Sequence, residues 1–208
     1  MIGAGVACLR VASDPFARLV GWSYVALVRN TPPLVFLFVF YFFVSSQLIA
    51  PLGLDSLARE GAGRDVVAFF FGDPRLFEAF VVGCVALAMF EAAYVAEILR
   101  AGIEAVPKGQ SEAARALGLS EWERMRRVVG PQALKKVAPP LASQLVSLIK
   151  DSSLLSVIAV QDLTYKASQA ALTNRNHFEI WLTVGALYFV LCYGCARLSK
   201  PLEGARRE

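Results

Sequence analysis

One apolar stretch, Leu34 to Ala50 (LVFLFVFYFFVSSQLIA), limits this chain to few kinds of fold. It contains no charged residue, and prolines flank it, with Pro32 and Pro33 before it and Pro51 after it. A helix rises about 1.5 Å per residue, so roughly 17 to 25 apolar residues are needed to cross a bilayer. The stretch therefore predicts a helix that spans a membrane.

The composition of the whole chain supports a membrane protein. Of its 208 residues, 56% are hydrophobic and 18% are charged, and the mean hydropathy is +0.52. The chain is therefore more apolar and less charged than an ordinary soluble domain. Its length fits one domain of several spans. We predict an all-α, polytopic membrane helix bundle that forms a single domain over residues 1–208.

Three further stretches are long and apolar enough to span. The second predicted span carries Glu78 near one end and Glu91 inside, and the third is interrupted at Lys150-Asp151-Ser152-Ser153. The apolar run from Met1 to Leu9 is too short to cross alone. We therefore expect four clear spans and a short or truncated first span, at residues 1–12 (truncated), 34–50, 76–99, 137–160 and 178–198.

Basic residues concentrate between the second and third of the four clear spans. There the basic side chains are Lys108, Arg115, Arg124, Arg126, Arg127, Lys135 and Lys136, and the acidic ones are Glu112, Glu121 and Glu123. Loops rich in Lys and Arg lie on the cytoplasmic side. We therefore place residues 107–131, here called the coupling segment, and the basic C-terminus in the cytoplasm. The same bias explains the pI near 9.0, so no nucleic-acid partner is expected.

Local signals divide the coupling segment into two short helices. Ser111 can cap the first helix, and Gly118 can end it in the left-handed conformation. Ser120 and Glu123 match a capping box that starts the second helix, which we expect to end near Gly130-Pro131.

The first of these helices has a small-residue face. The face consists of Ala113, Ala114, Leu117 and Leu119, with Glu112 and Arg115 at its margin. A helix this short is unstable alone, so it could insert into the groove of a partner protein. It could equally be a connector that packs on its own bundle, because short connecting helices are common. Spacing alone leaves both interpretations open.

The coupling segment resembles the EAA signature of the membrane subunits of ABC importers. That pattern is E-A-A, three residues, G, nine residues, then I-x-L-P. Here Glu112-Ala113-Ala114 and Gly118 match, Val128 stands for the isoleucine and Pro131 for the proline. Gly130 replaces the usual leucine, a departure that weakens a packing contact more than the docking role.

Further motifs narrow the resemblance to the polar amino-acid permeases of the histidine/glutamine type. They occur in order along the chain, from about Gly3 to Leu202: Tyr24-Val25, residues 29–35, 93–100, 107–110, 131–133, 139–141 and 148–154. The resemblance implies an ABC-importer permease fold (MetI-like). That family commonly has five spans, and Met1 to Leu9 aligns only with the last part of the first.

The resemblance also implies the partners. Two cytoplasmic ABC ATPase subunits would receive the coupling helix through Ser111, Glu112, Ala113, Ala114, Arg115, Leu117, Gly118 and Leu119. An external solute-binding protein would deliver an amino acid, and the chain would pair with itself or a sister permease to form the pathway. ATP and Mg would bind the partner ATPase, and this chain would hold no cofactor, no metal and no catalytic residue.

Polar residues inside the predicted spans are candidates for the substrate path. Charged groups within spans usually face the bundle interior or a water-filled path. The candidates are Glu91 on the second span and Ser143, Gln144, Ser147, Lys150 and Asp151, whose helical spacing makes one polar stripe on the third. The alternative is that Glu91, Lys150 and Asp151 pair with one another and only hold helices in register.

Other functional classes fit less well. No HExxH, GxSxG or glycine-rich phosphate loop occurs, so enzyme chemistry finds no support. A secondary transporter or channel without an ATPase is the main alternative, but matching halves with broken helices are not evident. A membrane scaffold without transport is a third interpretation.

Overall fold

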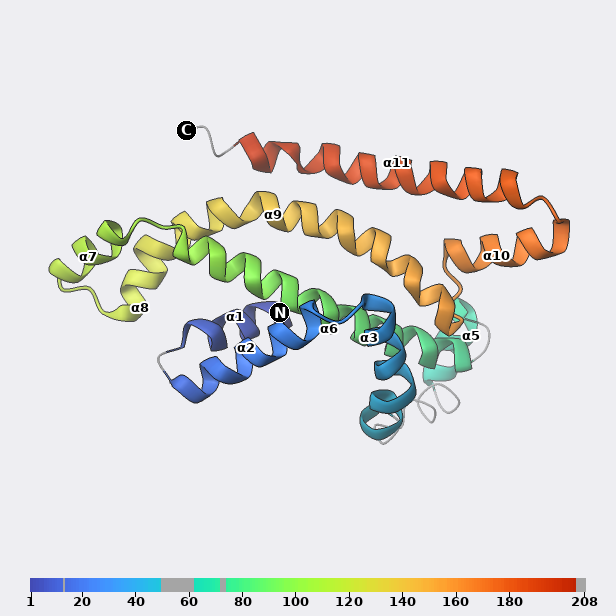
Figure 1. Cartoon of the computed structure of the whole chain (residues 1–208), viewed down its shortest axis with the longest axis horizontal. Helices are drawn as coiled ribbons and strands as arrows, with labels where there is room; N and C mark the ends of the chain where they lie inside the picture. The colour runs from blue at the N-terminus through green and yellow to red at the C-terminus, as the bar shows by residue number, and fades with distance from the viewer. Residues whose placement is uncertain (13, 50–61, 72–73, 205–208) are drawn as a thin grey trace. The chain divides into compact units, whose positions relative to one another are not determined.

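A computed structural model describes residues 1–12, 14–49, 62–71 and 74–204, and every regular element in these ranges is a helix (Figure 1). The all-α prediction is therefore confirmed. The elements in chain order are α1 (Ile2–Val11), α2 (Pro15–Arg29), α3 (Pro33–Val39), π-helical η1 (Phe40–Ile49), α5 (Ala62–Phe71), α6 (Pro74–Glu104), α7 (Lys108–Ala116), α8 (Glu121–Arg124), π-helical η3 (Met125–Val129), α9 (Gly130–Asp151), 3-10 helix η4 (Ser152–Ile158), α10 (Leu163–Asn174) and α11 (His177–Gly204).

Three of the described helices are long and apolar enough to cross a membrane. They run over Leu76–Glu104, Glu121–Ile158 and His177–Ser199. A fourth span is counted when Pro15–Arg29 and Pro33–Val44 are taken together across their short break. The predicted span at residues 34–50 is covered by α3 and η1, and its last residue, Ala50, lies outside the described residues.

Proline and serine residues set several helix boundaries. Pro15, Pro33 and Pro74 each begin a helix, where a missing N–H costs nothing. At the interruption expected in the third predicted span, α9 gives way to the 3-10 helix η4. There the Ser152 and Ser153 hydroxyls each donate to the carbonyl three residues earlier, at 2.7 Å.

The chain forms two compact units, each discontinuous in sequence. Unit 1 comprises Met1–Arg29, Glu91–Ser147 and Tyr193–Glu208, and unit 2 comprises Asn30–Phe90 and Leu148–Cys192. The long helices α6, α9 and α11 each contribute residues to both units.

Unit 2 has an aliphatic core supplied by α6, α3, η1 and η4. On α6, Ala79, Val82 and Ala86 recur at helical spacing and are buried. They pack with Leu155 and Ile158 of η4, among others. Each large aliphatic side chain buried in this way stabilises the fold by roughly 1.5–3 kcal/mol. The same unit contains the hairpin of α10 and the start of α11, visible in Figure 1.

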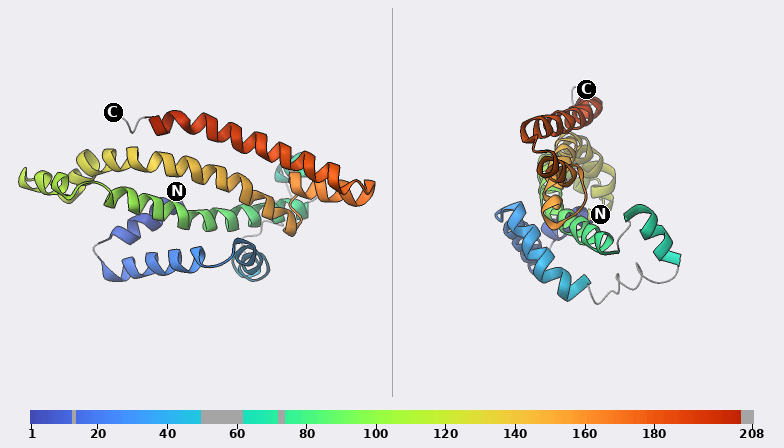
Figure 2. Two further views of the ribbon diagram at one scale, coloured as in Figure 1. Left: turned by 45° about the horizontal axis from the view of Figure 1, so that its top comes forward. Right: turned by 90° about the vertical axis from the view of Figure 1, so that its right-hand side faces the viewer.

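Unit 1 holds α1 and α2 as a hairpin beside the C-terminal half of α6 (Figure 2). Glu97 of α6 is the centre of an ion cluster. Arg10 of α1 and Arg100 of α6 bond to its carboxylate, the latter at 2.6 Å, and Arg29 of α2 approaches to 3.9 Å. Arg100 also pairs with Glu104 at 2.5 Å. The cluster therefore joins three helices through one carboxylate.

Candidate coupling segment and substrate path

The helix of the coupling segment begins earlier than the sequence suggested. The prediction that Ser111 caps it is wrong, because α7 starts at Lys108 with Pro107 as the N-cap residue. Pro107 has φ −55° and ψ 132°, an extended conformation that turns directly into the helix. Ser111 therefore lies inside α7, where its side chain is half-buried.

The end of α7 agrees with the sequence prediction. Gly118 has φ +77°, the left-handed conformation expected of it. The Gly118 N–H donates to the Arg115 carbonyl at 2.9 Å, and the Leu119 N–H donates to the Ala114 carbonyl at 3.1 Å. These two bonds form a Schellman cap, which satisfies carbonyls that the helix end would leave exposed.

The capping box that opens α8 is also confirmed. The Glu123 N–H donates to the Ser120 hydroxyl at 3.3 Å, and the Ser120 N–H donates to the Glu123 carboxylate at 3.2 Å. The predicted stop at Gly130-Pro131 is wrong. The helix continues through η3 into α9 without a break, because Gly130 is right-handed and Pro131 lies in the first turn of α9.

An ionic brace fixes the corner between α7 and α8. Glu121 accepts from Arg115 of α7 at 3.0 Å and from Arg124 of its own helix, whose Nη1 lies at 2.8 Å. One carboxylate thus joins the two helices on either side of Gly118. The sequence analysis did not identify this brace, although opposite charges six and three residues apart were the available signal.

The predicted docking residues divide between the outer and inner faces of α7. Ala114 is buried at 3% exposure, Ser111 and Leu119 are half-buried, and the remaining five are exposed: Glu112, Ala113, Arg115, Leu117 and Gly118. Leu117, directly after the last residue of α7, is 80% exposed. The helix therefore presents an apolar side chain, with charges beside it, to its surroundings.

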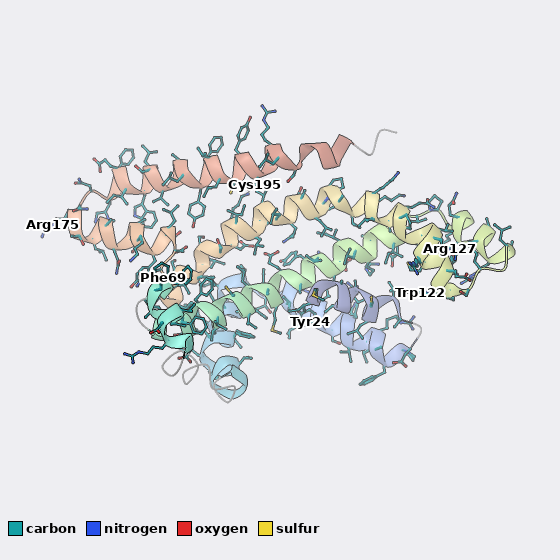
Figure 3. All side chains as sticks on the ribbon, turned by 180° about the vertical axis from the view of Figure 1, so that it is seen from behind. Tyr24, Phe69, Trp122, Arg127, Arg175 and Cys195 are labelled. Carbon is teal, nitrogen blue, oxygen red and sulfur yellow. The ribbon has the colours of Figure 1, made fainter. Side chains whose placement is uncertain are left out.

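Trp122 is a second large, exposed apolar residue of the coupling segment and was absent from the predicted set. It is 69% exposed at the start of α8. Figure 3 shows Trp122 and Arg127 at the end of unit 1 that contains α7 and α8. Tryptophan and arginine are enriched where proteins bind one another. The signal in the sequence was a large aromatic residue two positions after the capping serine.

In unit 1 the structure brings together two of the predicted path residues. Glu91 of α6 is buried at 6% exposure, and the Gln144 side-chain amide of α9 donates to its carboxylate at 2.6 Å. Ser147 is half-buried and Ser143 is exposed. The contact places a carboxylate and an amide, both suited to bind polar ligands, side by side within the bundle.

In unit 2 the other two predicted path residues lie at the end of α9. Lys150 is exposed, while Asp151 is half-buried and lines a small apolar pocket. The remaining lining residues are Pro33, Phe36, Leu37, Ala86, Leu87, Phe90, Leu154 and Leu155. The Phe36 and Phe90 rings lie 5.6 Å apart by centroid. A single carboxylate at an otherwise apolar pocket can orient a cationic group.

Known proteins match almost the whole chain. Residues 1–200 match a protein family described as binding-protein-dependent transport system inner membrane component. The chain is 35% identical over 207 residues to the probable glutamine ABC transporter permease protein GlnM of Bacillus subtilis (strain 168), covering 98% of this chain and 84% of that protein. It is 33% identical over 201 residues to the glutamate/aspartate import permease protein GltK of Escherichia coli, covering 97% of this chain and 82% of that protein.

A solved structure gives a matching fold. The crystal structure of an amino acid ABC transporter with histidines superposes with a TM-score of 0.76 at 33% sequence identity, covering 100% of this chain and 84% of that chain.

Proposed function

The chain belongs to the family of binding-protein-dependent transport system inner membrane components, and on this premise we propose that it imports polar amino acids. The family makes it a multi-pass inner-membrane protein and a permease subunit of an ABC importer. The observation that carries the proposed substrate is similarity, over at least 97% of the chain, to permeases named for glutamine and for glutamate and aspartate.

In this proposal, ATP is hydrolysed by two separate ATPase subunits, and an external solute-binding protein delivers the amino acid. The chain forms half of the translocation pathway and pairs with a second copy or a sister permease. The coupling segment and the C-terminus lie in the cytoplasm. The exposed basic residues of α7 and η3, including Arg115 and Arg127, support that orientation.

The coupling helix α7 docks on the ATPase through Ser111 to Leu119. Its exposed Leu117 and the neighbouring Trp122 support a protein-binding role for this end of unit 1. When the ATPases close on ATP, they push α7, and the brace at Glu121 passes the push to α8. The bundle then switches access from outside to inside, as a mechanical two-state element does.

The substrate path runs past Glu91, Ser143, Gln144, Ser147, Lys150 and Asp151. Glu91 supports this assignment because it is buried and holds a polar partner, Gln144, at 2.6 Å. Carboxylates inside membrane bundles usually serve transport or helix contacts, since exposure to lipid costs at least about 2.5 kcal/mol. A carboxylate in the path would meet the ammonium or guanidinium of the substrate.

The central test is reconstitution of the chain with its ATPase and solute-binding protein in lipid. We expect one or a few polar amino acids to raise ATP hydrolysis and to be taken up together with it. Uptake that proceeds without the ATPase, driven by an ion gradient, would instead establish a secondary transporter.

A substitution tests the path. Glu91→Gln removes the charge and keeps the shape, so we expect a change in which amino acid stimulates ATP hydrolysis. Glu78→Gln is the matched control, because it makes the same change on the same helix. Unchanged selectivity of the Glu91 variant, with normal assembly, would mean that Glu91 only holds helices together.

A further inference from the structure

Gly130 departs from the leucine of the EAA pattern, and the structure gives a steric reason. The Gly130 N–H donates to the carbonyl of Met125, five residues earlier, and closes the π turn η3. A β-carbon at Gly130 would lie 2.5 Å from that carbonyl oxygen. The neighbour is backbone, so it cannot move aside without opening the turn. The π turn in this form therefore requires glycine at position 130.

The hydrogen-bond ladder of the helix is weakened at this point. The hydrogen bonds of a π turn join residues five apart instead of four, and single π turns inside α-helices occur frequently at functional sites. The next residue, Pro131, has no N–H to donate, so one carbonyl of η3 receives no ladder bond from it. Kinks in helices arise at such positions. The helix 121–151 can therefore bend here, as it also can at Pro139 and Pro140 inside α9.

The α7–α8 corner is also connected to α6, and this second connection leaves α-helical geometry beside η3. Between α6 and α7 the chain passes through a turn at Ala105 and Val106 before Pro107. Val106 packs with Val129 and Ala133 in one small buried cluster. The two connections therefore lie together, one a turn and the other a π turn.

The α7–α8 corner on one side of η3 and the α6–α9 pair on the other are each held by their own contacts. On the α7–α8 side, Glu121 braces Arg115 and Arg124, and Ser120 caps α8. On the other side, α6 and α9 approach so closely that a β-carbon at Gly102 would collide with Val137. The Lys136 ammonium also donates to the Ala105 carbonyl.

We propose that η3, closed by Gly130 and followed by Pro131, is the joint about which the α7–α8 corner changes its angle to α9 during transport. This inference rests on the proposed function. Gly130 is then a positioning residue for coupling: it contacts neither substrate nor ATP, and it permits the bend that turns ATPase closure into motion of α9.

The test measures amino acid imported per ATP hydrolysed, in reconstituted complexes. For Gly130→Ala and Gly130→Leu we expect this ratio to fall on the order of tenfold, since hinge substitutions alter turnover without touching the chemistry. Gly185→Ala is the matched control, because Gly185 is also a helical glycine but has nothing within 4 Å of an added β-carbon. Its ratio should equal that of the wild type.

A second measurement keeps the test decisive if the Gly130 variants fail to assemble. Spin labels are placed at Ala116→Cys and Leu145→Cys, both exposed positions of unit 1, after the four native cysteines are replaced by serine. With Gly130 intact, we expect the label separation to differ between the nucleotide-free and ATP-bound complexes.

Two results would overturn the joint: a coupling ratio unchanged in both Gly130 variants, or, where these do not assemble, a label separation that is the same in both nucleotide states. A wild-type complex whose ATP hydrolysis no amino acid stimulates would count against the proposed function instead. The two failures are therefore distinguishable.

Discussion

The α7–α8 corner and the Glu91–Gln144 contact lie in the same unit but are built in opposite ways. In the corner, Glu121 bonds to residues six and three positions away, and all of these side-chain contacts are exposed. Glu91 and Gln144 are 53 positions apart, and Glu91 is buried. The corner is thus specified by neighbouring residues, whereas the polar contact exists only after α6 and α9 have packed.

The difference separates stability from coupling. Exposed ion pairs each contribute roughly 0–1 kcal/mol, so the corner adds little to the stability of the whole chain. In the proposed function, the corner holds the docking helix at a fixed angle. A hydrogen bond between helices in a membrane is worth about 1–2 kcal/mol in model peptides. Substitutions in the two regions should therefore change different measurable quantities.

The largest effect is expected from Gly118→Val. A β-branched residue at φ +77° costs roughly 1–3 kcal/mol of strain and destroys the Schellman cap. We expect uptake and binding of the ATPase to be lost, while the spans still insert. Copurification of the ATPase with the variant measures this. Intact assembly and uptake would mean that the corner has no docking role.

The Gln144→Leu substitution probes the other region. It removes the amide that donates to Glu91, so we expect the free energy of unfolding to fall by about 1–2 kcal/mol. Thermal unfolding of the detergent-solubilised complex gives the shift, with Ser143→Ala, an exposed neighbour on α9, as the control. Equal shifts in the two variants would mean that the buried contact contributes nothing of its own.

A smaller effect is expected from Ser120→Ala, which removes the N-cap of α8. Loss of such a cap costs about 1 kcal/mol, but here it acts on a short helix at the edge of the molecule. We expect slightly faster hydrogen exchange in α8 and a lower transport rate, with the global unfolding midpoint almost unchanged. Ser120→Asp should restore the exchange rate, because aspartate caps helices equally well.

The smallest change in stability is expected from Glu121→Gln. It removes the brace from Glu121, which is 70% exposed, to Arg115, which is 62% exposed, and to Arg124, whose side chain is 13% exposed, so roughly 0–1 kcal/mol is at stake for each pair. We expect the variant to import less amino acid per ATP hydrolysed. At high salt the wild-type ratio should fall toward that of the variant, because salt screens exposed ion pairs. A wild-type ratio that does not change with salt would mean that the brace plays no part in coupling.

The helical class, the capping box and the left-handed Gly118 could be predicted from sequence because each depends on a few adjacent residues. The start and end of the coupling helices could not. Serine is favoured at the N-cap position, which made Ser111 a candidate, but the N-cap residue is Pro107, one turn earlier. Gly130-Pro131 resembled a stop, yet glycine there closes a π turn, and the pair continues the helix.

Of the candidate sites, the sequence indicated the α7 surface and the polar residues of α9. It could not indicate which of them meet. The bond from Gln144 to Glu91 depends on how α6 and α9 pack, and Trp122 became a candidate only when its exposure was known. The brace at Glu121 is an intermediate case, since its partners are close in sequence but joined only by the turn at Gly118.

The locality of the α7–α8 corner has a consequence for biosynthesis. Its caps and the ion pairs of Glu121 join residues no more than six positions apart, although α7 also packs against η3, so the corner needs residues as far as Val129 for its full set of contacts. Because all of these residues precede α9, we expect the local contacts of the corner to begin forming before α9 has been inserted. The nascent chain would then already carry a partly formed corner, the docking element of the proposed function, while its later helices are still being made.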